Sequence, residues 1–207
     1  MIAIVDYRAG NLTSVRLAFE ALNVPCTVTS SAADVLAAER VVFPGVGAAG
    51  AAMRALRSLG LEDTIRQVVA AGTPFLGICL GTQIILEESE EDDGTACIGV
   101  LPGRVPRFRP VDRYDKIPQI GWNAVTSRRP HPLLDGIEQD SEFYFVHSYY
   151  PAPSRPEHII GETTYADATF ASIIGTNNLF ATQFHPERSG RIGLKLLENF
   201  TRWDGKC

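Results

Sequence analysis

Short apolar runs alternate with segments of helical periodicity over residues 1–88, and this alternation restricts the fold more than any other feature of the sequence. The apolar runs are residues 2–5, 26–29, 41–45 and 74–78. Apolar residues at helical spacing and Ala-rich stretches predict helices over residues 12–22, 32–38, 48–59, 61–71 and 80–88. Asn11 is the expected N-cap of the first helix. Strands that alternate with helices predict a parallel sheet covered on both faces.

The pattern changes after about residue 97, where the apolar runs become shorter and turn residues separate them. These runs predict strands over residues 98–101, 103–108, 117–125, 142–147, 157–164, 170–174 and 179–185. Such a series suits antiparallel pairing, and segment 190–203 returns to helical spacing. We therefore expect one domain over residues 1–207, an α/β fold with an open mixed, mainly parallel sheet flanked by helices. Ligands of such sheets bind beyond the carboxyl ends of the strands.

The charge balance argues against a nucleic-acid-binding protein. The 207 residues include 24 acidic and 19 basic side chains, a net charge of -5, whereas a nucleic-acid groove normally carries a basic excess. The nearest basic cluster is interrupted by two aspartates, and we interpret it as a solvated or partner-facing loop. It comprises Arg104, Arg107, Arg109, Arg113 and Lys116.

The cysteines and the N-terminus favour a cytoplasmic location. Cys26, Cys79, Cys97 and Cys207 show neither a C-x-x-C pair nor metal-ligand spacing. Met1 leads directly into an apolar run without a positive region, and no run approaches the roughly 20 residues of a membrane span. We expect a protein that is neither secreted by this route nor embedded in a membrane.

Residues 77–81, Gly-Ile-Cys-Leu-Gly, place Cys79 between two glycines where a predicted strand meets a predicted helix. This is the nucleophile-elbow pattern G-x-S-x-G with sulfur in place of oxygen. The glycines relieve crowding at a sharp turn, and the helix N-terminus stabilises a thiolate. The backbone N–H of Leu80 then faces a developing oxyanion. The alternative is a buried structural cysteine beside glycines required for packing.

Residues 183–187, Gln-Phe-His-Pro-Glu, supply a candidate base at the end of another predicted strand. Strand alternation points His185 and Glu187 to the same side, so the carboxylate can orient the imidazole and stabilise its protonated form. Taken alone, the pair also fits a surface histidine beside a solvated glutamate. A third strand end carries residues 44–47, Pro-Gly-Val-Gly, whose backbone N–H groups suit a second oxyanion donor. Glycine-rich turns of this kind are common, so only the three strand ends taken together indicate an active site.

The elbow 77–83 followed by residues 183–187 resembles the class I, or triad, glutamine amidotransferases. Further similarity covers nearly the whole chain and lies in residues 10–15, 44–47, 120–123 and 143–150. The segments Gly-Trp-Asn and Phe-Val-His-Ser-Tyr resemble the subgroup of glutaminase subunits that serve histidine biosynthesis. The resemblance implies hydrolysis of L-glutamine to glutamate and ammonia through a Cys–His–Glu triad. It also implies a heterodimer with a separate (β/α)₈-barrel cyclase that forms imidazole glycerol phosphate and an aminoimidazole carboxamide ribotide, and no cofactor.

The same resemblance assigns roles to residues at matching positions. Cys79 matches the nucleophile, His185 the base and then acid, and Glu187 the orienting carboxylate, with backbone N–H groups of Val46 and Leu80 as oxyanion donors. The positions that hold the glutamine amino-acid end are Gly47, Gln83, Glu91, His147, Ser148 and Tyr149. A charged Glu91 is a sensible partner for the substrate ammonium, and His147 is favoured as a main-chain contact over a base. The expected partner interface comprises Asn11, Trp122, Tyr144 and Arg188.

Two residues depart from the subgroup pattern. Thr82 stands where methionine is commonest, which puts the packing of the glutamine pocket in doubt. Arg188 stands where lysine is usual, and it replaces a point charge with a planar fork.

Trp122 and Tyr144 also fit core aromatics. Three alternative functions remain, and one is a non-enzymatic partner or regulatory module with a degenerate site, although all three triad side chains are present. The glutaminase could serve a different synthase, such as one that makes pyridoxal phosphate. A dienelactone-type cysteine hydrolase also uses this elbow, although its carboxylate is expected before the histidine.

Overall fold

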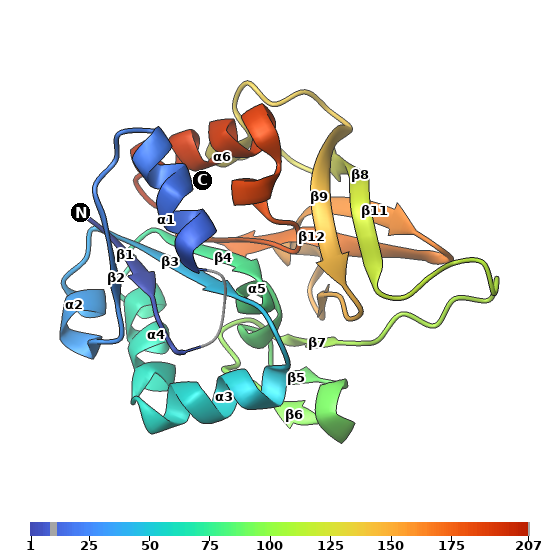
Figure 1. Ribbon diagram of the computed structural model, residues 1–207, viewed down its shortest axis with the longest axis horizontal. Coiled ribbons are helices and arrows are strands. Elements are labelled where there is room, and N and C mark those ends of the chain that lie inside the picture. The colour runs from blue at the N-terminus through green and yellow to red at the C-terminus, as the bar shows by residue number, and fades with distance from the viewer. Residues whose placement is uncertain (9–11, 207) are drawn as a thin grey trace.

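The computed structural model describes residues 1–8 and 12–206, and a mixed β-sheet with helices on both faces forms its centre (Figure 1). Within those residues the sheet has nine strands. In spatial order they are β2 (Cys26–Thr29), β1 (Ile2–Val5), β3 (Arg40–Gly45), β4 (Phe75–Cys79), β13 (Leu179–Thr182), β12 (Ala168–Thr176), β11 (Ile159–Tyr165), β8 (Gln119–Ser127) and β9 (Ser141–His147). The sequence-based fold class, an α/β mixed sheet flanked by helices, is confirmed.

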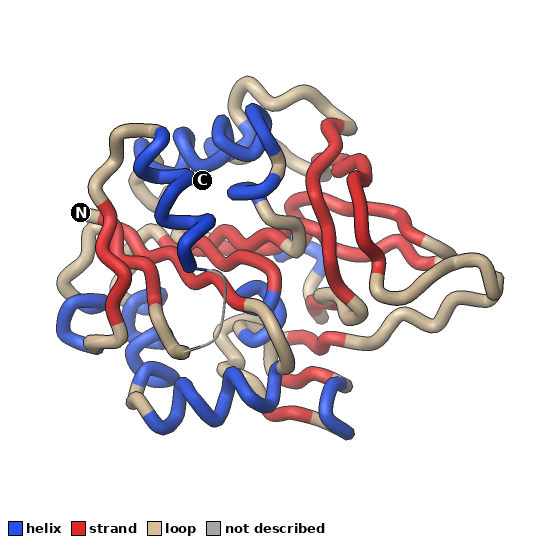
Figure 2. The backbone as a smooth tube through the Cα atoms, in the orientation of Figure 1, coloured by secondary structure: helices blue, strands red, loops and turns tan. Residues whose placement is uncertain are grey.

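The sheet divides into a parallel part and an antiparallel part. The pairings from β2 to β13 are parallel, and those from β13 to β9 are antiparallel. The change of sequence pattern after residue 97 predicts this division except at β13, which pairs antiparallel with β12 but parallel with β4. Figure 2 shows the antiparallel strands at one side of the molecule, next to the long loop that connects β7 to β8.

Helices cover the two faces of the sheet as separate groups (Figure 1). Helices α2 (Ala32–Leu36), α3 (Ala49–Ser58), α4 (Leu61–Ala70) and α5 (Leu80–Ile84) bury side chains against one face. Helices α1 (Leu12–Ala21) and α6 (Gly190–Arg202) pack on the other. Strand alternation explains the two cores: Ala3 and Val5 of β1 face the first group, whereas Ile2 and Ile4 face the second.

A second, smaller sheet lies beside the first. Its strands are β10 (Ala152–Pro153), β7 (Gly103–Val105), β5 (Glu88–Ser89) and β6 (Thr95–Ala96). Short 3₁₀ helices complete the described elements: η1 (Glu91–Asp93), η2 (Pro132–Leu134), η3 (Pro156–His158) and η4 (Pro186–Arg188). In the part of the chain that the structure describes, no helix is long and apolar enough to cross a membrane.

Two sequence predictions in the region 80–101 are wrong, and one set of contacts explains both. Helix α5 ends at Ile84 instead of near residue 88, and residues 98–101 form no strand. The backbone N–H groups of Ile98, Val100 and Leu101 donate to carbonyls of Ile84 and Ile85 at 2.8 to 3.1 Å. The segment therefore satisfies the free carbonyls at the end of α5, which a helix terminus requires, and its N–H groups are not available to a sheet.

The chain order brings three loops of the parallel part together. Strands β3, β4 and β13 are neighbours, and all three run in the same direction. Gly45 at the end of β3 is the register partner of Cys79 at the end of β4. The segment that follows β13 contains His185, so all three predicted strand-end motifs lie at one edge of the sheet, where α/β folds bind ligands.

Candidate active site

Cys79 occupies a strained turn between β4 and α5. Its backbone has φ 53° and ψ −109°, in the left-handed half of φ space that non-glycine residues rarely adopt. A Cβ at Gly81 would lie 1.9 Å from the carbonyl oxygen of Phe43, and a Cβ at Gly77 would lie 2.8 Å from the Cβ of Ala181. Both glycines are therefore required by close approach of the neighbouring strands, as the elbow pattern predicts.

His185 and Glu187 form a buried pair. His185 Nδ1 lies 2.8 Å from Glu187 Oε1, and the two side chains are 5% and 4% exposed. Burial opposes protonation of the imidazole, but the charge of Cys79 and the bond to Glu187 outweigh it and raise the pKa of His185 to about 10. His185 Nε2 is buried and makes no conventional hydrogen bond. Because Nδ1 is taken by Glu187, the ring acts on Cys79 through Nε2.

These groups open onto a cavity of about 380 Å³ that contains most of the predicted site residues. Its walls include Val46, Gly47, Cys79, Leu80, Gln83, Glu91, His147, Ser148, Tyr149 and His185. The structure thus brings together predicted residues from five separate segments of the sequence. Glu187 lies behind His185 and is not part of the wall.

Glu91 links this cavity to the loop after β3. Its Oε2 accepts a hydrogen bond from the backbone N–H of Ala49, at the first turn of α3, at 2.8 Å. Burial raises the pKa of Glu91, and the bond from Ala49 partly offsets that effect. A carboxylate at a helix N-terminus is electrostatically favoured, so Glu91 holds α3 and the end of the 44–48 loop in place.

The side chain of His147 contacts the main chain of the same segment. Its Nδ1 lies 2.7 Å from the carbonyl oxygen of Tyr149. A carbonyl only accepts, so Nδ1 carries the hydrogen. Burial lowers the pKa of His147 to about 4, despite the contact with Tyr149. The ring is therefore neutral near pH 7 and presents Nε2, which is buried and has no hydrogen-bond partner, as an acceptor.

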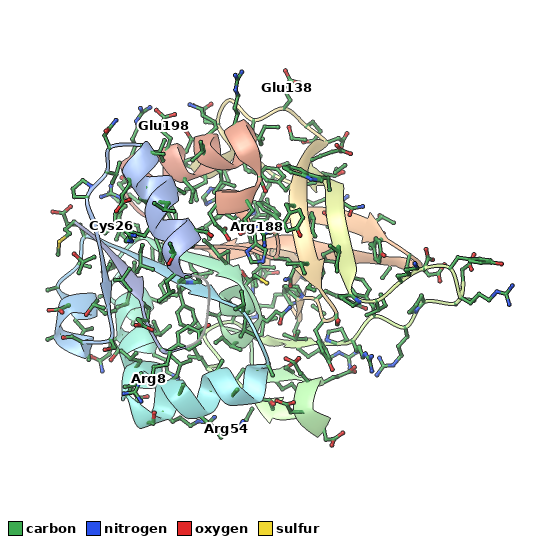
Figure 3. The ribbon with its side chains drawn as sticks, viewed as in Figure 1. Arg8, Cys26, Arg54, Glu138, Arg188 and Glu198 are labelled. Atoms are coloured by element: carbon green, nitrogen blue, oxygen red, sulfur yellow. The ribbon has the colours of Figure 1, made fainter. Side chains whose placement is uncertain are left out.

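Trp122 is exposed and Tyr144 is half-buried, so they are not core aromatics. They are direct partners across β8 and β9, and their rings meet edge to face with centroids 6.0 Å apart. The guanidinium of Arg188 lies 4.7 Å from the centre of the Tyr144 ring, and Figure 3 shows Arg188 between α6 and β9. Trp122, Tyr144 and Arg188 therefore form a surface beside residues 185–187. The predicted cap and interface residue Asn11 lies outside the described residues.

Thr82 does not line the cavity. It is fully buried, and its hydroxyl donates to the carbonyl oxygen of Thr182 at 2.6 Å. The departure from methionine therefore links α5 to the end of β13, and it does not alter the wall of the pocket.

Gln183 is a site residue that the sequence analysis missed. It is fully buried, and its Nε2 lies 3.7 Å from the Cys79 sulfur. The alternation that aligns His185 with Glu187 also extends back to Gln183, so the signal was present. Pro118 and Val146 line the cavity without having been predicted, whereas Gln183 does not line it.

Comparison with known proteins gives one consistent family. Residues 3–203 match the model of the family described as Glutamine amidotransferase class-I. The imidazole glycerol phosphate synthase subunit HisH of Nitratidesulfovibrio vulgaris strain Hildenborough is 50% identical, over 98% of this chain and 96% of that protein. The protein of the same name from Nitrosococcus oceani is 48% identical, over 99% of this chain and 98% of its own length.

Solved structures share the fold at much lower identity. The structure described as "Crystal structure of glutamine amidotransferase" aligns with a TM-score of 0.71 at 18% identity, and covers 98% of both chains. The "Structure of PurLQS from Thermotoga maritima" aligns with a TM-score of 0.72 at 16% identity, over 97% of both chains.

Proposed function

The chain belongs to the class-I glutamine amidotransferase family, and from that premise we propose its function in full. It is the glutaminase subunit of an imidazole glycerol phosphate synthase and acts in histidine biosynthesis. It hydrolyses L-glutamine to glutamate and ammonia. The high identity to HisH subunits over nearly the whole chain supports the subgroup, and the cavity around Cys79 supports the chemistry.

In the first half of the proposed reaction, the Cys79 thiolate attacks the carboxamide carbon of glutamine. Backbone N–H groups of Val46 and Leu80 stabilise the oxyanion of the tetrahedral intermediate. His185 holds the proton and gives it to the departing nitrogen, which leaves as ammonia while a thioester forms on Cys79. The raised pKa of His185, to about 10 against burial and with the charge of Cys79 in favour, supports a protonated imidazole at rest.

In the second half, water hydrolyses the thioester. His185, now neutral, takes a proton from the attacking water and keeps it, while the Cys79 sulfur leaves as a thiolate. Glutamate departs, and the thiolate and protonated imidazole of the starting state are restored. Glu187 holds the ring by Nδ1 and stabilises its protonated form throughout. The buried 2.8 Å contact between these two side chains supports that role.

The remaining cavity residues are proposed to bind the amino-acid end of glutamine. They are Gly47, Gln83, Glu91, His147, Ser148 and Tyr149. Glu91 is the only one of them with an acidic side chain, and we assign it to the substrate ammonium. Their position on the wall of the same cavity as Cys79 supports this assignment.

The ammonia is consumed by a separate subunit, which we propose to be a (β/α)₈-barrel cyclase. The similarity to proteins named as one subunit of imidazole glycerol phosphate synthase supports a separate partner chain. Trp122, Tyr144 and Arg188 form the proposed docking surface, and the exposure of Trp122 at 51% supports this. A cytoplasmic location is part of the same proposal and follows from the biosynthetic role.

The observation that carries the proposal is Cys79 at a strained elbow, in one cavity with the buried His185–Glu187 pair. Replacing Cys79 by Ala removes the nucleophile and is expected to abolish glutamate formation. In complex with the cyclase, the same variant should still make product from free ammonium at alkaline pH. Cys97→Ala is the matched control and should retain glutaminase activity, because Cys97 is buried outside the cavity.

Two outcomes of this experiment would contradict the proposal. Substantial glutamate formation by Cys79→Ala would mean that another residue is the nucleophile. Loss of the ammonium-dependent reaction would mean that the substitution damages assembly and not the chemistry of glutamine.

A further inference from the structure

Gln183 and Gln83 form a buried chain of amides that ends at the Cys79 sulfur. Gln83 Nε2 donates to the carbonyl oxygen of Tyr149 at 2.8 Å and to Gln183 Oε1 at 2.9 Å. Gln183 Nε2 then lies 3.7 Å from Cys79 Sγ. Gln183 is fully buried and Gln83 is 5% exposed, so water does not compete for these bonds.

The main-chain carbonyl of Tyr149 fixes the direction of every bond in this chain. A carbonyl oxygen only accepts, so the nitrogen end of Gln83 must face it. The same nitrogen also reaches Gln183, which must therefore present its oxygen to Gln83. The amide nitrogen of Gln183 is left to face Cys79. The sulfur thus meets a hydrogen-bond donor whose orientation is set by its neighbours.

We propose that Gln183 is a positioning residue that holds the Cys79 sulfur and stabilises its thiolate form by donating a hydrogen bond. A thiolate is a much better acceptor than a thiol, so the bond favours the charged form. Gln183 acts through Cys79 and does not line the substrate cavity. This inference rests on the proposed role of Cys79 as nucleophile.

Two titratable side chains, His185 and Tyr7, also interact with the charge of Cys79, and their effects must be distinguished from that of Gln183. His185 follows β13, and its pKa is raised by the charge of Cys79 against the effect of burial. Tyr7 follows β1 and is fully buried; burial raises its pKa, and the charge of Cys79 adds to that effect. Glu187 and His147 act on His185 in turn. A substitution at Gln183 leaves all four in place.

The test measures the pH dependence of alkylation at Cys79 in the wild type, Gln183→Leu and Gln183→Glu. Each protein is treated with iodoacetamide, and mass spectrometry of the Cys79 peptide separates its reaction from that of the other cysteines. Only the thiolate reacts, so the midpoint of the profile reports the charged form. Neither glutamine nor a partner is needed.

Thr82→Val is the matched control. It removes the 2.6 Å hydrogen bond from the Thr82 hydroxyl to the Thr182 carbonyl oxygen. Thr82 precedes Gln83 and Thr182 precedes Gln183, so this bond joins the same two segments of the chain. It does not remove a donor from the sulfur. Its alkylation midpoint is expected to match that of the wild type. The control therefore distinguishes loss of the hydrogen-bond donor to the Cys79 sulfur from weaker packing of the two segments.

The proposal predicts that the midpoint rises by about one pH unit or more in Gln183→Leu, since a hydrogen bond to a charged group is lost. Gln183→Glu should raise it further, because a negative charge then faces the sulfur. If Gln183→Leu does not fold, Gln183→Glu decides the question. An unchanged or lower midpoint in either folded variant would overturn the proposal.

Glutaminase activity of the wild type with its cyclase partner is measured in parallel. A shifted midpoint together with an inactive wild type would refute the proposed function and keep the role of Gln183. An active wild type together with an unshifted midpoint would refute the role of Gln183 alone.

Discussion

In the proposed mechanism His185 moves the proton, and Glu187 orients the His185 ring through the contact with Nδ1. His185→Ala removes the proton carrier, whereas Glu187→Ala removes only orientation and charge support. Groups that orient a base commonly contribute less than the base itself. We expect Glu187→Ala to retain glutaminase activity at least about tenfold above that of His185→Ala. The comparison is made on folded proteins at saturating glutamine, and equal activities would contradict the division of roles.

Single residues of the cavity could be predicted because their types and spacings are unusual. Cys79 between two glycines and His185 two residues before Glu187 are patterns with a chemical reason, and the cavity contains or adjoins them. Gln183 was missed because the alternation places it on the same side as His185 but gives a glutamine no chemical role of its own. Its function depends on Gln83, which lies 100 residues away in the chain, and no local pattern shows that contact.

Gly81 in the turn after β4 and Gly47 in the loop after β3 differ in the space available for a side chain. A Cβ at Gly81 would lie 1.9 Å from the Phe43 carbonyl oxygen, so Gly81→Ala should displace α5 from β3 and lower stability by several kcal/mol. A Cβ at Gly47 meets nothing within 4 Å, but the residue has φ 94°. Gly47→Ala should cost about 1 kcal/mol in backbone strain.

Urea denaturation of both variants and their glutaminase rates provide the measurement. Gly47→Ala is expected to remain folded and to lose turnover, because its backbone shapes the loop that carries the Val46 N–H. Full turnover in a folded Gly47→Ala protein would count against that loop as an oxyanion donor. Gly45 is a poor site for such a test, since a Cβ there would lie 1.9 Å from the Tyr7 hydroxyl.

Elements with a strong period could be predicted, and short or irregular ones could not. The strands 2–5 and 26–29 have the bounds expected from the sequence. In contrast, β5 and β6 have two residues each, which is too short for any period to appear. Segment 98–101 is apolar because Ile98 and Leu101 are core residues, but its N–H groups bind to the end of α5.

At the scale of the whole molecule, buried neutral histidines make the fold sensitive to acid. Burial is the main cause that lowers the pKa of both His131 and His147 to about 4, from an ordinary value near 6.5. Between these values the unfolded chain binds protons that the folded chain does not. The free energy of unfolding should therefore fall as the pH decreases from 6.5 towards 4.

The variant His131→Asn isolates one of these histidines. Asn keeps an acceptor for the backbone N–H of Leu133, which His131 Nδ1 now binds at 3.1 Å, and it does not titrate. In urea unfolding between pH 4 and 6.5, its stability should depend less steeply on pH than that of the wild type, by up to one proton per molecule. An identical slope in the two proteins would show that His131 is not held neutral by burial.

The order of strands in the sheet could be predicted only in outline. Alternating strands and helices indicate a parallel sheet, and the change of pattern indicates an antiparallel extension. Strand β13 comes from the far end of the chain and pairs with β4, and no local sequence pattern predicts this long-range pairing. This pairing places His185, which follows β13, close to Cys79 at the end of β4, so the site depends on the topology of the whole molecule.

We propose that this chain is a glutaminase whose ammonia is used by a separate cyclase. The most direct test measures glutamate formation from glutamine by the purified chain, alone and in complex with the cyclase and its nucleotide ligand. We expect glutamate formation to be much faster in the liganded complex and to match the formation of imidazole glycerol phosphate one to one. No glutamate in either state, or glutamate formation that the cyclase does not affect, would contradict the account.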